Sequence, residues 1–459
     1  MPKFRPIVPT PPERLNPFAK FGLEDNPFPP EPTIAPGSPD PRLRGDIFDP
    51  QVRPQRIREF EERFIRVDFS RLHRSIGYLW SLGAHDVTRG MGKSALLIYF
   101  KQHINHDYGD VFFGGTQRVC AIYIYPSPGT RHFFQVAALA VMQTNEEGIL
   151  LDALRFLHYR ALSEGRAGLD PAVVADIQTD KEFEQLSEMA WLGSRGINMF
   201  SLTAAVRDML IENGMAESHA NDFATRTHSV AEFRSYLNTF SQSKWRQMAS
   251  DMLCNQVVAM LRAAGFNGAY LFIDELENVV LSQSKKDREV FAKDLRAWLV
   301  DGMLSQAAQQ GFFVTVLTIH ARVQTEMLPA WDVSGLEQIA PSNRMSDPSH
   351  SVTLAELEPE ECRRLLNAYL KYYRLAETDY PALFPFTDEA VDKMSVHATH
   401  HPRQLLKLAH GVLEKAVNDD TIEGQIDGDY IDAYLDSLAT ATAVEADEDA
   451  IARMALGLS

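Results

Sequence analysis

Short apolar runs alternate with longer amphipathic segments along most of the chain after residue 53. Four runs have the length and the β-branched or aromatic content of buried strands: "IGYLWSL" at 76–82, "RVCAIYIYP" at 118–126, "GAYLFIDE" at 268–275 and "GFFVTVLTIH" at 311–320. Helical periodicity appears between them, at 94–104 and 287–310. Buried strands that alternate with helices predict an α/β fold whose parallel sheet is covered on both faces.

The regions outside this alternation divide the chain further. Apolar residues recur at helical spacing through most of 130–265, which predicts a large helical insertion between the second and third strands. The same spacing returns after residue 356 and predicts a separate helical domain. The predicted divisions are a proline-rich extended arm (1–52), the first part of the sheet core (53–129), the helical insertion (130–265), the second part of the core (266–355), a helical domain (356–440) and an acidic C-terminal tail (441–459) that is either helical or frayed.

The N-terminal arm is dominated by prolines, as in "NPFPPEPTIAPGSPDP". Proline fixes φ and lacks a backbone donor, so a regular helix or a central strand is not expected there. Either the segment is disordered, or it is an extended arm that packs on its own domain or on a neighbouring subunit. Phe18, Phe21 and Phe28 are the side chains that a packed arm would bury.

Composition and charge exclude several classes of protein. The net charge of −17 disfavours nucleic-acid binding as a property of the whole surface, and the arginine-rich stretch 51–74 also carries carboxylates, as a solvated helix face does. No apolar run reaches the roughly 18 residues that a membrane span needs, and the first residues lack the apolar core of a signal peptide. Three widely spaced cysteines match neither a zinc site nor a disulfide framework, which favours a cytoplasmic protein.

The sequence "VTRGMGKS" at 87–94 lies between the first predicted strand and a predicted helix. A G-x-x-x-x-G-K-[ST] loop surrounds phosphate oxygens with backbone N–H groups, its lysine reaches the β- and γ-phosphates, and its hydroxyl binds Mg²⁺. Val87 replaces the first glycine, and Gly83 could open a longer loop instead; a plain strand–helix turn is the alternative. The predicted nucleotide-binding residues are Thr88, Arg89, Gly90, Met91, Gly92, Lys93, Ser94 and Ala95.

A second motif, "YLFIDELEN", places Asp274 and Glu275 at the tip of the third predicted strand. Ligands of parallel sheets bind at the carboxyl ends of strands. An aspartate there can share Mg²⁺ with Ser94, and the adjacent glutamate can activate a water molecule. A strand that ends in a polar turn is the alternative, but the two motifs together favour a nucleotide-hydrolysing site.

These motifs resemble the Walker A and Walker B motifs of AAA+/STAND P-loop ATPases, and more narrowly those of bacterial and archaeal relatives of origin-recognition ATPases. The resemblance covers roughly 55–125 and 265–435 and implies that 356–440 is a lid. It also implies a sensor 1 residue at Thr318 or His320, although His320 could instead be a strand-end histidine bonded to backbone. Arg344 would be an arginine finger or an ordinary loop arginine. Arg403, in "HPRQLL", resembles sensor 2, although His401 stands where the family has glycine.

The resemblance implies a Mg²⁺-dependent ATPase that switches conformation or assembles with a protein partner, as a homo-oligomer. In the alternative, ATP serves only to assemble a non-hydrolysing scaffold. A third alternative is a DNA-dependent ATPase of transposition, replication or anti-phage defence, since bacterial relatives often work in such operons; the acidic charge favours indirect DNA contact through a partner.

Overall fold

The computed structural model describes residues 16–71, 76–82, 89–175, 177, 179–226, 230–301, 311–343, 348–376, 379–422 and 424–440. The chain forms two compact units, each with its own apolar core. Unit 1 combines residues 1–54 with 356–459, and unit 2 is residues 55–355. Val87, Thr88, Arg344, Gly83 and the predicted tail 441–459 lie outside the described residues.

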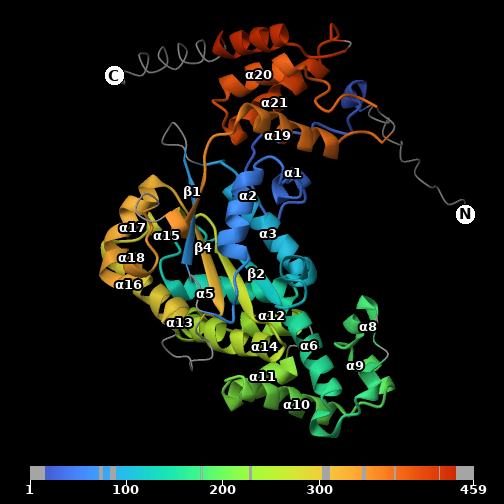
Figure 1. Ribbon diagram of the computed structural model, residues 1–459, viewed down its shortest axis with the longest axis vertical. Helices are drawn as coiled ribbons and strands as arrows, with labels where there is room; N and C mark the ends of the chain where they lie inside the picture. Colours follow the sequence, from blue (N-terminus) through green and yellow to red (C-terminus); the bar gives the residue numbers. More distant parts are fainter. Residues whose placement is uncertain are drawn as a thin grey trace, which may run out of the picture. The chain divides into compact units, whose positions relative to one another are not determined.

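Unit 2 contains one five-stranded parallel sheet (Figure 1). The strands are β1 (Ile76–Ser81), β2 (Val119–Ile124), β3 (Gly268–Ile273), β4 (Phe313–Ile319) and β5 (Ser351–Leu354), in the order β2-β3-β4-β1-β5. Every residue of β1 to β4 is buried. Both faces are therefore covered, as the continuous apolar runs predict.

The helices that precede and follow β1 in the chain cover one face of the sheet. They are α2 (Pro54–Phe60), the π-helical turn η2 (Glu61–Ile65), α3 (Lys93–Asp107) and α4 (Asp110–Phe113). Phe60 of α2 stacks on Phe100 of α3 and meets Phe272 of β3 edge to face. Gly77 of β1 leaves room for the ring of Phe64, because a Cβ there would lie 2.2 Å from that ring.

The opposite face is covered by the helices that follow β2, β3 and β4 (Figure 1). After β3 come α15 (Glu277–Val280), α16 (Lys285–Leu295) and the π-helical η5 (Arg296–Val300); after β4 come α17 (Ala321–Ser334), α18 (Leu336–Ile339) and the 3-10 turn η7 (Pro348–His350). Tyr78 of β1 points to this face, where its hydroxyl donates to the Ala340 carbonyl and accepts from the Trp331 indole. Adjacent positions of β1 thus face different helical layers.

The helices between β2 and β3 are continuous with the sheet's core rather than a separate body. They are α5 (Phe133–Glu146), α6 (Ile149–Ser163), the 3-10 turn η3 (Arg166–Gly168), α7 (Ala172–Ala175), α8 (Asp180–Gln185), α9 (Met189–Ser194), α10 (Met199–Glu212), α11 (Glu217–Arg226), α12 (Val230–Asn238), α13 (Gln242–Asp251), the π-helical η4 (Met252–Val257) and α14 (Val258–Ala263). A single apolar cluster runs from Ile122 of β2 through Leu154 of α6 to Leu210 of α10.

Unit 1 joins the N-terminal arm to the C-terminal helices α19 (Pro359–Tyr372), α20 (Asp388–His397), α21 (Pro402–Val417) and helical residues 428–440. Phe18, Phe21 and Phe28 are buried in its core, so the described part of the arm is packed on these helices. The arm does contain two short helical turns, η1 (Pro17–Phe21) and α1 (Pro41–Arg44). Each begins with proline, which the first turn of a helix tolerates, so the expectation that proline excludes regular helix holds only for longer helices.

Two further predictions can be compared with the described residues. No helix among them is long and apolar enough to cross a membrane. The three cysteines, Cys120, Cys254 and Cys362, are buried and not paired in disulfides.

Candidate functional site

The candidate site lies at the carboxyl ends of β1, β3 and β4. The helix that follows β1, α3, packs on the face of the sheet that carries Phe272. The helix that follows β4, α17, packs on the opposite face, beside Tyr78. A parallel sheet opens a crevice where consecutive connections leave on opposite faces, and ligands bind there.

Two glycines shape the described part of the loop between β1 and α3. Gly90 has φ 88° and Gly92 has φ 92°, a left-handed conformation that side-chain-bearing residues rarely adopt. A Cβ on Gly92 would meet no atom within 4 Å, so the backbone conformation rather than crowding favours glycine there. Because α3 begins at the next residue, its unpaired amides and the positive end of its dipole lie at this loop.

Lys93, the first residue of α3, is buried against the end of β1. Its Nζ donates to Ser81 Oγ at 2.7 Å. Burial lowers the pKa of Lys93, and the negative charges of Glu277, Asp274 and Glu275 oppose that shift. A buried ammonium whose pKa is shifted by burial and by several nearby carboxylates is a candidate functional group.

Asp274 and Ser94 are linked through Tyr123, the penultimate residue of β2. The Tyr123 hydroxyl donates to Asp274 Oδ2 at 2.6 Å, and the Ser94 side chain lies close enough to that hydroxyl to influence its pKa. Burial and the charge of Asp274 raise the pKa of Tyr123 well above its usual range, so it remains a donor. Ser94 and the acidic tip of β3 thus lie beside the same tyrosine hydroxyl.

Glu275 is held by two hydrogen bonds in a left-handed backbone conformation, with φ 44°. Its Oε2 accepts from the Tyr125 hydroxyl at 3.0 Å and from Asn278 Nδ2 at 3.1 Å. Burial, followed by the contact with Glu275, raises the pKa of Tyr125. A non-glycine residue in this conformation costs roughly 1–2 kcal/mol, which these contacts and the Glu275 N–H bond to Asp274 Oδ1 help to offset.

Glu277 is a member of the cluster that the sequence interpretation missed. It is 3% exposed, and its Oε2 has no hydrogen-bond partner among the described residues. Arg89, a predicted nucleotide-binding residue, lies 3.5 Å from its Oε1. Burial raises the pKa of Glu277, and the charge of Lys93 opposes this. The sequence "DELE" carried the available signal, because it places a further carboxylate, Glu277, only three residues after Asp274.

The two candidates for sensor 1 lie at the end of β4. Thr318 pairs in register with Leu79 of β1 and is fully buried, with no hydrogen-bond partner for its Oγ1 in the described part of the chain. His320 follows the strand, and burial together with the charges of Lys93 and Arg89 lowers its pKa to about 4. His320 therefore belongs electrostatically to the Lys93 cluster. The role of either residue stays a prediction.

Arg403 lies in unit 1, at the second position of α21. Its Nε donates to the Pro32 carbonyl of the arm at 3.0 Å. Two residues just before it, Thr399 and His400, have left-handed φ values of 51° and 55°. Its role as sensor 2, like that of Arg344 as a finger, stays a prediction.

No protein-family model and no curated protein matches the chain. Among solved structures, the Aeropyrum pernix ORC2 protein, determined in ADPNP–ADP complexes, resembles it with 11% sequence identity and a TM-score of 0.39. The similarity covers 87% of this chain and 68% of that one. Nothing about function follows from so distant a likeness, so the function is argued from the residues of the site.

Proposed function

We propose that the protein binds ATP with Mg²⁺ at the carboxyl ends of β1 and β3 and hydrolyses it. One observation carries this proposal: Ser94 at the start of α3 and Asp274 at the tip of β3, far apart in sequence, both lie beside the Tyr123 hydroxyl. The phosphate-loop sequence and the acidic strand tip are therefore neighbours in space, as one nucleotide site requires.

Phosphate binding is assigned to the loop and the first turn of α3. Gly90 and Gly92 have the backbone conformation in which successive N–H groups can face an anion. Lys93 is already buried there and would exchange its bond to Ser81 for phosphate oxygens. Thr88, Arg89, Met91 and Ala95 complete the proposed nucleotide-binding set.

The residues present fit a magnesium ion. Ser94 and Asp274 offer hard oxygen ligands, and each oxygen of Asp274 retains a second lone pair beyond the hydrogen bond that it accepts. No group of three His, Cys, Asp or Glu side chains among the described residues could hold a metal ion. That agrees with Mg²⁺, which is commonly held by one or two protein ligands, phosphate oxygens and water. When bound, the ion would neutralise charge on the phosphates.

Glu275 is proposed as the group that accepts a proton from the attacking water. Tyr125 and Asn278 both hold its Oε2 in the structure, and the proposal requires the carboxylate to turn from them toward the water. Thr318 or His320 would sense the γ-phosphate from β4. Arg403, and Arg344 as a finger from a neighbouring subunit, would act on the transferring phosphoryl group.

The wider role follows the same proposal. The helices between β2 and β3 would be an insertion on a P-loop ATPase core, and the C-terminal helices of unit 1 would be its lid. Hydrolysis would switch the conformation of a homo-oligomer, or its assembly with a protein partner, in a DNA-transaction or anti-phage defence complex. DNA contact through the partner agrees with the net charge of −17.

Two variants test the site. Lys93→Ala is expected to abolish ATP binding at this site, because its charge faces the phosphates in the proposed site. Glu275→Gln is expected to bind ATP with near-normal affinity but to retain it, with phosphate release at least about a hundredfold slower. Isothermal titration with ATP and a phosphate-release assay measure the two effects. Unchanged turnover in Glu275→Gln would refute the assignment of the base.

A non-hydrolysing, ATP-dependent scaffold is the second candidate. The two hydrogen bonds that hold Glu275 favour it, because a restrained carboxylate is not free to activate water. Light scattering with and without ATP, alongside phosphate release with and without partner candidates, separates the two functions. Assembly on ATP without any phosphate release would establish the scaffold.

A further inference from the structure

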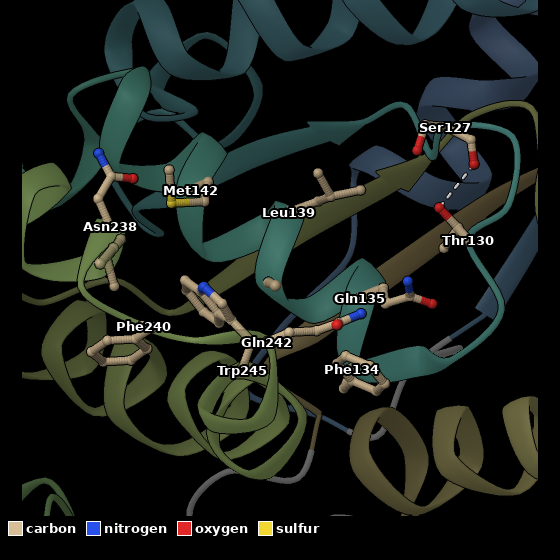
Figure 2. A pocket seen from close by; sticks show the side chains of 12 residues that line it. Ser127, Thr130, Phe134, Gln135, Leu139, Met142, Asn238, Phe240, Gln242 and Trp245 are labelled. Carbon is tan, nitrogen blue, oxygen red and sulfur yellow. Dashed lines mark hydrogen bonds between the residues drawn. The ribbon is translucent and has the colours of Figure 1, made fainter.

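A second pocket in unit 2 lies outside the proposed nucleotide site. It has a volume of about 480 Å³ and opens between α5 and the segment that joins α12 to α13 (Figure 2). The loop that follows β2 closes one end, where Ser127 and Thr130 lie. Pockets of about 300–1,000 Å³ are the size that small ligands occupy.

The chemistry of the lining favours a planar, neutral ring. Phe134, Phe240 and Trp245 supply aromatic surfaces, and none of the twelve lining side chains is charged. Asn238 and Gln242, both exposed, add two lining side-chain amides that make no hydrogen bond to another described residue (Figure 2). Aromatic faces bind a heteroaromatic ring by stacking, and primary amides bind the donor and acceptor atoms along its edge.

Two cations border this aromatic lining. Lys244 Nζ lies 3.6 Å from the ring centroid of Phe240, and the Arg246 guanidinium lies 5.8 Å from that of Phe134. Neither cation forms an ion pair within the part of the chain that the structure describes. They are two positions apart in α13 and lie beside different rings, so each could pair separately with an anionic group of a ligand whose ring occupies the pocket.

We propose that this pocket is a second ligand site, which binds a small planar heteroaromatic ring carrying an anionic group, as in a mononucleotide. The ring would stack against Trp245, while Asn238 and Gln242 would contact its edge, and either Lys244 or Arg246 would pair with the phosphate.

The pocket is connected to Glu275 by the loop that forms its end wall. Tyr125 opens this loop and holds Glu275. Asn278 donates both to Glu275 and to the Pro126 carbonyl, and Ser282 donates to the Thr130 carbonyl. A ligand that moves Ser127 and Thr130 therefore shifts the groups that restrain Glu275. This coupling rests on the proposed function, whereas the binding site itself does not.

Adenosine monophosphate, titrated into the Lys93→Ala protein by calorimetry, tests the site with the phosphate loop disabled. We expect saturable binding, which weakens about tenfold with Trp245→Ala and at least fivefold with Lys244→Ala/Arg246→Ala. Arg195→Ala is the matched control, because Arg195 lies 5.1 Å from the Trp191 ring, away from the pocket lining. The double variant changes only surface charges, so it keeps the test valid if Trp245→Ala fails to fold.

Each outcome decides the matter. Loss of binding with both pocket variants but not with Arg195→Ala supports the proposal. Absence of binding to Lys93→Ala, or equal binding by all variants, overturns it, as does binding of an oligothymidylate of about ten residues without binding of the mononucleotide. Failure of the proposed function is seen separately, as a number of ATP molecules bound per chain that Lys93→Ala leaves unchanged.

Discussion

At the residue scale, the carboxylate of Glu275 is restrained from two directions. Tyr125 comes from the end of β2 and Asn278 from the first turn of α15. Because Ile124 and Ile273 pair in register, the chains of β2 and β3 end side by side, and Tyr125 emerges beside the acidic tip. If Glu275 is the base proposed above, its release from these two contacts is a step that a substitution can accelerate.

Tyr125→Phe should raise the rate of ATP hydrolysis. The substitution removes one hydrogen bond of about 1 kcal/mol that favours the restrained carboxylate, so the active population should rise about fivefold. Steady-state phosphate release at saturating ATP measures the effect. Tyr159→Phe, at a surface tyrosine of α6, is the control and should leave the rate unchanged. A slower Tyr125→Phe enzyme would mean that Tyr125 assists the reaction.

His320 should make unit 2 sensitive to acid. Its pKa falls from the ordinary 6.5 to about 4 in the fold, because burial and the charges of Lys93, Arg89 and Arg322 disfavour the imidazolium. Between these two values the unfolded chain binds a proton that the folded chain does not. The contribution of neutral His320 to the free energy of unfolding is therefore fully present above pH 6.5 and is lost as the pH falls toward 4.

The loss should amount to about 2 kcal/mol, once partial access of solvent is allowed for. Denaturant titrations of the wild type and of His320→Asn between pH 7 and 4 measure it, and the two curves should converge at the acid end. His103→Asn, at an exposed histidine of α3, should follow the wild type. Parallel pH curves for wild type and His320→Asn would contradict the assignment.

The sequence could predict those site residues that occur in spaced motifs. Lys93 and Ser94 follow a glycine pair that needs left-handed backbone, and Asp274 ends an apolar run, so both motifs are local. Tyr123 and Tyr125 could not be predicted, because their contacts with Asp274 and Glu275 depend on the pairing of β2 with β3 across about 150 intervening residues.

At the scale of elements, the contact of η2 with β1 depends on a glycine in the strand. Phe64 occupies the space over Gly77, where a Cβ would lie 2.2 Å from the ring. The ring of Phe64 in turn meets Phe60 edge to face, and Phe60 stacks on Phe100 of α3. The helical layer on this face therefore packs directly on β1, the strand that precedes α3.

Gly77→Ala should destabilise unit 2 by roughly 1–3 kcal/mol, because the added methyl overpacks a closed site. Chemical denaturation followed by circular dichroism measures the change. Gly193→Ala is the matched control, since a Cβ there meets nothing within 4 Å and should be neutral or slightly stabilising. Combining Gly77→Ala with Phe64→Leu should restore part of the loss; a Gly77→Ala protein of wild-type stability would contradict this packing.

Periodicity predicted the strands β1 to β4 and most helices because each is continuous and strongly apolar on its buried side. It could not predict the strand order, since nothing local in the sequence records that β4 lies between β3 and β1. Nor could it predict that the helices after β2 share one core with the sheet, because the apolar face of an amphipathic helix can pack against many different partners.

At the scale of the whole molecule, the chain's first and last described segments build the same unit. The arm runs along α21: Lys20 donates to the Ala416 carbonyl, His410 Nδ1 bonds the Phe28 carbonyl, and Lys407 pairs with Glu31. Phe28 is fully buried between Tyr369 and Phe386. Unit 1 therefore depends on residues that are separated by the whole of unit 2.

Phe28→Ala should destabilise unit 1 by about 3–5 kcal/mol while leaving unit 2 folded. Hydrogen exchange followed by mass spectrometry resolves this, because amides of α21 should lose protection and those of β1 to β4 should keep it. Val396→Ala, at an exposed position of α20, should change neither. Equal loss of protection in both units would show that they unfold as one.

The two halves of the core that the arm shares with α21 are synthesised at different times. A ribosome releases residues 16–54 long before it makes α19 to α21, and at about 5–20 residues per second the wait lasts roughly 15–60 seconds. During that interval Phe18, Phe21 and Phe28 have no completed partner surface, whereas residues 55–355 can already collapse. Nascent chains of this protein should therefore carry an exposed aromatic N-terminal segment, a natural ligand for chaperones that work at the exit tunnel.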